Sequence, residues 1–157
     1  MALNVGLVKG RRTVLHTAIE KKDLKEVERL LARGEDIELS GGMYGETPLM
    51  YAVYKNGGWP AGVRLLLEKK ADVNATLGME RTPLMIAGEF NRQEIAQNLI
   101  EAGADATLKY IDGRDAAAWA LKYNHKEIAS TLEAEVVRQT GLLRSQHEGQ
   151  KPLMDHS

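Results

Sequence analysis

Apolar residues recur at helical spacing in four stretches of the chain. The stretches contain Leu24, Val27, Leu30 and Leu31; Val63, Leu65, Leu66 and Leu67; Ile95, Ala96, Leu99 and Ile100; and Ile128, Ala129 and Leu132. Apolar positions three or four residues apart indicate a helix that is buried along one side. The pattern therefore predicts four amphipathic helices, each of which needs a neighbour to cover its apolar side.

A shorter apolar run precedes three of these helices, at about residues 48–55, 83–90 and 116–123. Thr47 and Thr82 can cap the free backbone N–H groups at the start of a helix, and the proline that follows each of them loses no needed donor. Asp115 offers the same cap to the third run. These helices fall below the ~12 to 15 residues needed for independent stability, so they must pack on neighbours.

The sequence Thr-Pro-Leu-Met occurs at residues 47–50 and 82–85, and degenerate copies begin at Thr13 and Asp115. The starting positions 13, 47, 82 and 115 are 34, 35 and 33 residues apart. This period is too long for a heptad and too short for a domain duplication. A polar turn signal at 34–37, 70–74 and 103–106 keeps the same phase, which argues against a chance repeat.

A capped Thr-Pro-Leu helix, an amphipathic helix and a Gly-Ala-Asp turn together resemble the ankyrin repeat family, over about residues 7–133. The resemblance implies an all-α solenoid of stacked helix-turn-helix units with short β-hairpin or loop fingers. We expect a repeat domain over residues 1–134, with repeats at about 7–39, 40–74, 75–107 and 108–134. Residues 135–157 are expected to form a C-terminal helical extension, interrupted at Gly141, and a tail that is disordered from Ser145 onwards.

Each second helix ends where the chain must turn back. Gly34 and Gly103 suit the left-handed conformation that closes a helix. Lys70 stands at the matching place in the second repeat and is expected to be mildly strained. Met50 and Met85 stand where the family usually has histidine, so they are expected to pack as apolar side chains.

The composition narrows the classes of partner. The 157 residues are 43% hydrophobic and 27% charged, and the formal net charge is -1. This balance lacks the basic footprint of a nucleic-acid binder, and no run approaches the ~18 apolar residues of a transmembrane helix. The chain has no cysteine, which excludes disulfides and thiolate metal sites. We expect a cytoplasmic protein that binds neither nucleic acid nor membrane.

No catalytic or metal-binding constellation is evident. His16 lies where ankyrin repeats carry a structural histidine, and His147 lacks the second histidine of a zinc helix motif. The chain contains no Gly-x-Ser-x-Gly elbow, and its paired glycines are not followed by the lysine of a phosphate loop. The sequence favours a protein that is not an enzyme and has no cofactor.

The resemblance implies that another protein binds the concave face, formed by the fingers and the inner helices. The candidate contact residues are Met43, Tyr44, Glu46, Tyr54, Lys55, Trp59, Met79, Arg81, Glu89, Phe90, Ile111, Arg114, Lys122 and Tyr123. Tyr54, Phe90 and Tyr123 are 36 and 33 residues apart and are expected to form an aromatic ladder across three repeats. Tyr51, Ile86 and Trp119 are expected to pack between repeats instead.

Two insertions interrupt the period, and both border the second repeat. One residue is added at 40–42, which lengthens a finger, and two are added within 56–62, between the two helices. The second insertion carries Trp59, either as a plug over the outer helices or as an exposed anchor for a partner.

These observations predict a non-catalytic interaction module that is a monomer when free. It resembles small bacterial ankyrin chains, which favours an inhibitor of one target, such as an immunity-type protein. An adaptor that bridges two proteins is the alternative. A third possibility is a solenoid that self-associates through Val136, Val137, Leu142 and Leu143.

Overall fold

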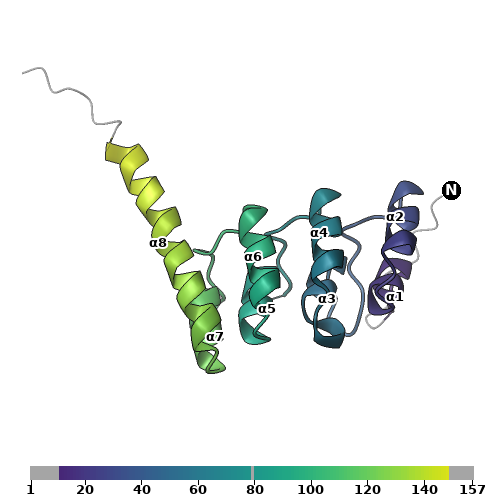
Figure 1. The fold of residues 1–157 in the computed structure, drawn as a ribbon, viewed down its shortest axis with the longest axis horizontal. Helices are drawn as coiled ribbons and strands as arrows, with labels where there is room; N and C mark the ends of the chain where they lie inside the picture. The colour runs from purple at the N-terminus through teal and green to yellow at the C-terminus, as the bar shows by residue number, and fades with distance from the viewer. Residues whose placement is uncertain (1–10, 79, 149–157) are drawn as a thin grey trace, which may run out of the picture.

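The computed structural model describes residues 11–78 and 80–148, and these form a row of stacked helix pairs (Figure 1). The inner row consists of α1 (Val14–Glu20), α3 (Pro48–Tyr54), α5 (Pro83–Glu89) and α7 (Ala116–Lys122). The outer row consists of α2 (Leu24–Ala32), α4 (Pro60–Glu68), α6 (Gln93–Glu101) and α8 (Lys126–Glu148), and a single 3-10 turn, η1 (Lys55–Gly57), follows α3. The predicted all-α solenoid is confirmed.

All four inner helices begin with the predicted cap. The side-chain oxygens of Thr13, Thr47, Thr82 and Asp115 each accept a hydrogen bond from the backbone N–H three residues later. These bonds measure 3.4, 3.3, 3.3 and 2.9 Å, respectively. Since every inner helix has the same cap and the same length of seven residues, the four helices present equivalent positions to the same side.

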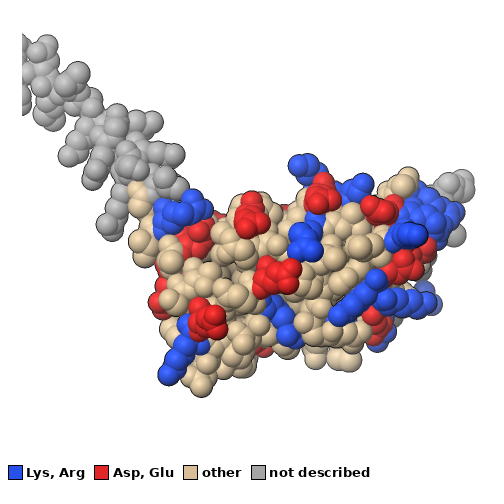
Figure 2. Space-filling view, in the orientation of Figure 1, with Lys and Arg blue, Asp and Glu red and all other residues tan. Residues whose placement is uncertain are grey.

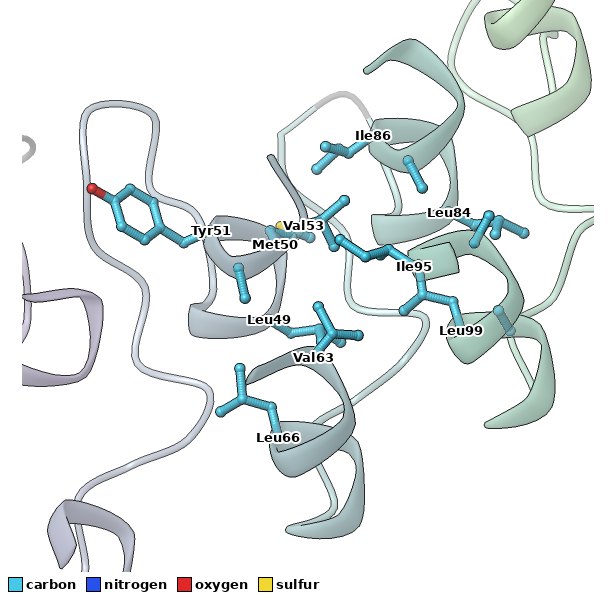
Figure 3. Close-up of a cluster of buried hydrophobic side chains, with 14 of the residues drawn as sticks. Leu49, Met50, Tyr51, Val53, Val63, Leu66, Leu84, Ile86, Ile95 and Leu99 are labelled. Carbon is cyan, nitrogen blue, oxygen red and sulfur yellow. The ribbon is translucent and has the colours of Figure 1, made fainter. Parts of the chain in front are cut away.

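The core runs continuously through the stack between the two rows (Figure 3). Leu49 and Met50 of α3 pack with Val63 and Leu66 of α4, while Leu84 belongs to the same cluster from α5. Met50 and Met85 are fully buried, as expected for apolar packing. In the described chain, α3 contacts both α1 and α5, and α4 contacts α6, so each repeat is covered by the next one.

The fingers that join the repeats are narrow loops rather than extended strands. Each finger takes the number of the repeat that it opens: the second holds an isolated antiparallel bridge between Gly41 and Glu46, and the third holds one between Leu77 and Arg81. In the last finger the Tyr110 N–H donates to the Arg114 carbonyl over 2.8 Å. The described residues therefore form hairpin-like fingers, but no continuous sheet.

The turns after the outer helices adopt the predicted left-handed conformation. Gly34 and Gly103 both have a φ of 92°, and Lys70 has a φ of 70° at the matching place. A side chain in this region is disfavoured, so the expectation of mild strain at Lys70 is confirmed.

The last outer helix continues past the places where the sequence suggested breaks. α8 runs without interruption from Lys126 to Glu148, through residue 134 and Gly141, and it extends beyond the other helices (Figure 1). The predicted interruption at Gly141 is wrong, as is the predicted disorder over 145–148. One glycine lowers helix stability by only about 1 kcal/mol, which the hydrogen bonds of a 23-residue helix outweigh. The rest of the predicted tail lies outside the described residues.

His16 ties the first repeat to the second finger. Its Nε2 donates to the Glu46 carbonyl over 2.9 Å, and its Nδ1 accepts from the Thr13 hydroxyl over 2.7 Å. The ring is completely buried, and this burial lowers the pKa of the imidazole below its usual 6.5. The predicted structural role of His16 is confirmed.

Stability is expected to fall as the pH is lowered through the range where an exposed histidine titrates. Because burial lowers the pKa of His16 in the folded state, the unfolded chain binds a proton first. The contribution of the neutral His16 ring to the free energy of unfolding is complete above pH 6.5 and is lost as the pH falls through the pKa of the folded state. Its size is about 1.4 kcal/mol for each unit by which folding lowers the pKa. Urea unfolding between about pH 7.5 and 5.5 measures this slope, and His16→Gln should flatten it. An equal slope in both proteins would contradict the assignment.

Candidate functional site

The fingers and the ends of the inner helices bring most of the predicted contact residues to one side of the stack. Met43 and Tyr44 at the tip of the second finger are 76% and 71% exposed, and Ile111 at the tip of the fourth is 63% exposed. Exposed apolar side chains that gather on one surface can mark a site of protein interaction. Met79, predicted for the third tip, lies outside the described residues.

Glu46 was predicted at an exposed place on the second finger, and this placement is wrong. The side chain is buried, and its carboxylate accepts hydrogen bonds from the Tyr54 hydroxyl and, over 3.0 Å, from the Tyr44 N–H. A buried carboxylate needs such donors. They fix the finger against α3 and hold Tyr44 at the tip.

Tyr54 and Phe90 form the first two members of the predicted aromatic ladder. Their rings stack with centroids 5.4 Å apart and planes inclined by 23°, and the edge of Tyr51 meets Tyr54 at 5.9 Å. Burial, followed by the hydrogen bond to Glu46, raises the pKa of Tyr54, which keeps the phenol protonated at neutral pH. Adjacent repeats are thus joined by aromatic contact along this side.

Tyr123 does not continue the ladder. Its ring stacks on Trp119 of its own repeat, with centroids 6.0 Å apart, and on His125 at 6.4 Å. Trp119 occupies the position that Ile86 fills in the third repeat. Tyr123 therefore has an aromatic ring to stack on within its own repeat, whereas Phe90 stacks on Tyr54 of the preceding repeat. Tyr51, Ile86 and Trp119 are all buried, which confirms that they pack inside.

A shallow pocket of about 300 Å³ lies between the second finger and the end of α3. Its lining residues are Arg12, Gly42, Met43, Tyr44, Tyr51, Tyr54 and Lys55. Lys55 stands over the Tyr51 ring at 5.7 Å and pairs with Glu20 at 3.6 Å. The pocket therefore has aromatic walls and a cationic rim, and a single partner side chain could enter it.

Trp59 is a buried plug and not an exposed anchor for a partner. Its prediction as a contact residue is therefore wrong. The side chain is buried, and its backbone N–H donates to the Ala52 carbonyl over 2.9 Å. The ring lies directly against Gly62, where any Cβ atom would overlap it. The inserted loop thus closes the space between α3 and α4.

A regular pairing links three of the fingers to their inner helices, and the sequence interpretation did not identify it. The residue just before the cap and the last residue of the helix, eight positions later, form what we call a rung. Arg12 pairs with Glu20, Glu46 accepts from Tyr54, and Arg81 pairs with Glu89. The fourth rung consists of Arg114 and Lys122. Opposite charges eight residues apart around the first and third caps were the signal that could have revealed the pairing.

Three cations surround Trp119 at the other end of the same side. The centroid of its indole lies 5.8 Å from Arg81, 5.4 Å from Arg114 and 4.6 Å from Lys122. Cations within about 6 Å of an aromatic face are attracted by it. The side of the stack is therefore aromatic near the second finger and cationic near the fourth.

Neither a metal-binding cluster nor a membrane-spanning helix is found in the described part of the chain. Residues 11–78 and 80–148 contain no group of three histidine, aspartate or glutamate residues placed to hold a metal ion. None of the helices in these ranges is both long and apolar enough to cross a membrane. Positive and negative side chains are interspersed over the face shown in Figure 2.

Comparison with known proteins agrees with this geometry. A family model described as ankyrin repeats, with three copies, matches residues 3–77 and again 58–140. The chain belongs to the ankyrin repeat family. Ankyrin repeats are generally protein–protein interaction modules, and the solenoid fits that role.

Relatives of this ankyrin repeat chain occur in bacteria and animals. It is 42% identical over 93 residues to the ankyrin repeat protein YahD of Escherichia coli strain K12, a match covering 57% of the chain and 46% of YahD. It is 38% identical over 68 residues to an ankyrin repeat protein of Rickettsia bellii, covering 43% and 40%. The Neurogenic locus Notch protein of Drosophila melanogaster is 31% identical over 127 residues, covering 72% of the chain and 5% of Notch. The chain thus spans less than half the length of these relatives.

Proposed function

We propose that the chain binds a partner protein through the finger tips and the ends of the inner helices, without catalysis. The observation that carries this proposal is the exposure of Met43 and Tyr44 at the second finger, beside the pocket. Exposed aromatic and methionine side chains are the types that dominate interface cores. The buried Glu46 that anchors Tyr44 supports a surface formed before the partner arrives.

In this proposal the concave face covers the surface of a single target, and the chain acts as an inhibitor or an immunity-type protein. The stack offers a continuous side from the second finger to the fourth, which favours one extended partner over two separate ones. In this proposal the free protein is a cytoplasmic monomer. An adaptor would instead hold two partners at once, so the stoichiometry of the purified complex separates the two functions.

Phe90→Ala is expected to weaken partner binding by about 1 to 2 kcal/mol, which is typical of truncating an aromatic interface residue. Phe90 is 38% exposed and stacks on Tyr54, so its loss should leave a gap at the surface and change stability little. Tyr54→Ala is less suitable, because it would leave the buried Glu46 carboxylate without one of its donors.

The experiment compares the wild-type chain and Phe90→Ala as baits in native cell extract, and then measures the dissociation constant of the purified partner by calorimetry. Val137→Ala is the matched control, since Val137 is exposed on α8, outside the finger side. Equal affinity of the partner for the wild type and for Phe90→Ala would contradict the proposed site.

A further inference from the structure

The four rungs are not equivalent in charge, although they occupy equivalent positions. The first and third join an arginine to a glutamate, and the second joins a carboxylate to a phenol hydroxyl. Each of these three rungs is closed within its own repeat. The fourth contains Arg114 and Lys122, two cations that cannot pair with each other.

Of the two cations in the fourth rung, only one has an acidic partner among the described residues. Arg114 pairs with Asp112 of its own finger at 2.8 Å, whereas Lys122 is exposed and forms no ion pair in the described ranges. Both cations instead lie over the Trp119 ring. Like charges that lie over the same ring repel each other, and no acid among the described residues forms an ion pair with Lys122 to offset this repulsion.

Two further donors in this area lack acceptors. The Nε1 of Trp119 and the Nε of Arg81 are buried and make no hydrogen bond within residues 11–78 and 80–148. Trp119 itself is more than nine-tenths buried. A buried donor without an acceptor is unfavourable, so the surroundings of Trp119 are not fully satisfied in the free protein.

We propose that the fourth rung binds a carboxylate from an acidic segment of the partner protein, which supplies the charge that Glu20 and Glu89 supply in the first and third repeats. This inference rests on the proposed function and names the chemistry of one part of the partner. The carboxylate lies against the ammonium of Lys122 and the guanidinium of Arg114, beside the Trp119 ring.

The balance of charge around the rung favours a single carboxylate over a phosphate or a nucleic acid. Glu89 pairs with Arg81, Asp112 pairs with Arg114, and Asp115 lies 3.9 Å from Lys109. Among the residues that the structure describes, Lys122 is thus the one cation of this group without an acid, which matches one negative charge. A polyanion would also meet these three carboxylates, and the net charge of the chain is already -1.

The first experiment titrates the wild-type chain with the acetylated, amidated peptide Gly-Glu-Gly and follows the indole N–H resonances by NMR. The Trp119 resonance is expected to shift with a dissociation constant on the order of 0.1 M, as for an exposed ion pair that contributes about 1 kcal/mol. The Trp59 resonance should stay in place, since Trp59 lies in the inserted loop of the second repeat. The peptide Gly-Gln-Gly and inorganic phosphate are the controls. An equal shift with glutamine, a response to phosphate alone, or no shift with glutamate overturns the inference.

Lys122→Glu provides the matched variant, because it recreates the Arg–Glu pair of the first and third rungs. It is expected to raise the melting temperature and to abolish the shift caused by the glutamate peptide, while Lys122→Arg keeps that shift. With the purified partner, Lys122→Glu should weaken binding at least about tenfold, as expected when a carboxylate meets a like charge. If the partner binds Lys122→Glu with unchanged affinity while Phe90→Ala weakens it, the inference fails and the proposed function stands.

Discussion

Leu84→Ala is expected to lower the free energy of unfolding by about 3 kcal/mol, within the ~2 to 5 kcal/mol range for leucine truncation in a core. Leu84 is 1% exposed in α5 and belongs to the cluster that joins the third repeat to its neighbours (Figure 3). The mutation removes buried methyl groups and leaves a cavity that two short helices cannot easily close. Urea unfolding followed by circular dichroism measures the change.

Leu121→Ala is the control for this experiment. It makes the same chemical change on α7, where the leucine is 49% exposed, so stability should change by less than about 0.5 kcal/mol. Losses of similar size in the two variants would show that the core between the rows does not determine the stability of the stack.

Two glycine-to-alanine substitutions in outer helices are expected to have opposite effects. At Gly62 of α4 a Cβ atom would lie 1.9 Å from a ring atom of the buried Trp59. Because the indole must move, Gly62→Ala should lower the free energy of unfolding by about 1 to 3 kcal/mol. At Gly141 of α8 no atom of the described part of the chain lies within 4 Å of the added atom. Gly141→Ala should therefore raise stability by about 0.5 to 1 kcal/mol.

Thermal unfolding of the two variants beside the wild type tests this pair. Tryptophan fluorescence in a Trp119→Phe background gives a second measurement, since displacement of the plug by Gly62→Ala should expose the Trp59 indole to water. If Gly62→Ala is as stable as the wild type, Trp59 does not close the space between α3 and α4.

The frame of the fold could be predicted because its signals are local. The caps at Thr47, Thr82 and Asp115 and the repeat period define where each inner helix begins, and the structure places each helix within a residue of the expected range. A cap depends on residues only three positions apart, so no knowledge of tertiary contacts is needed.

The surface could be predicted only in part, because it depends on which side chains meet after stacking. A charged residue such as Glu46 usually lies in water, and its burial becomes favourable only once the Tyr54 hydroxyl is placed beside it. Trp59 suits a plug and an exposed anchor equally well until the position of Gly62 is known. Tyr123 follows the spacing of Tyr54 and Phe90, yet the larger Trp119 below it redirects the ring.

The rungs have a consequence for how this surface can change over time. Each of the first three rungs closes within a single repeat, so a substitution at the end of one inner helix acts mainly on the chemistry of that repeat. The chain can therefore acquire a new target by a few changes at one level of the stack. The residues of one rung could likewise be substituted at a time, so that the binding surface is redesigned repeat by repeat.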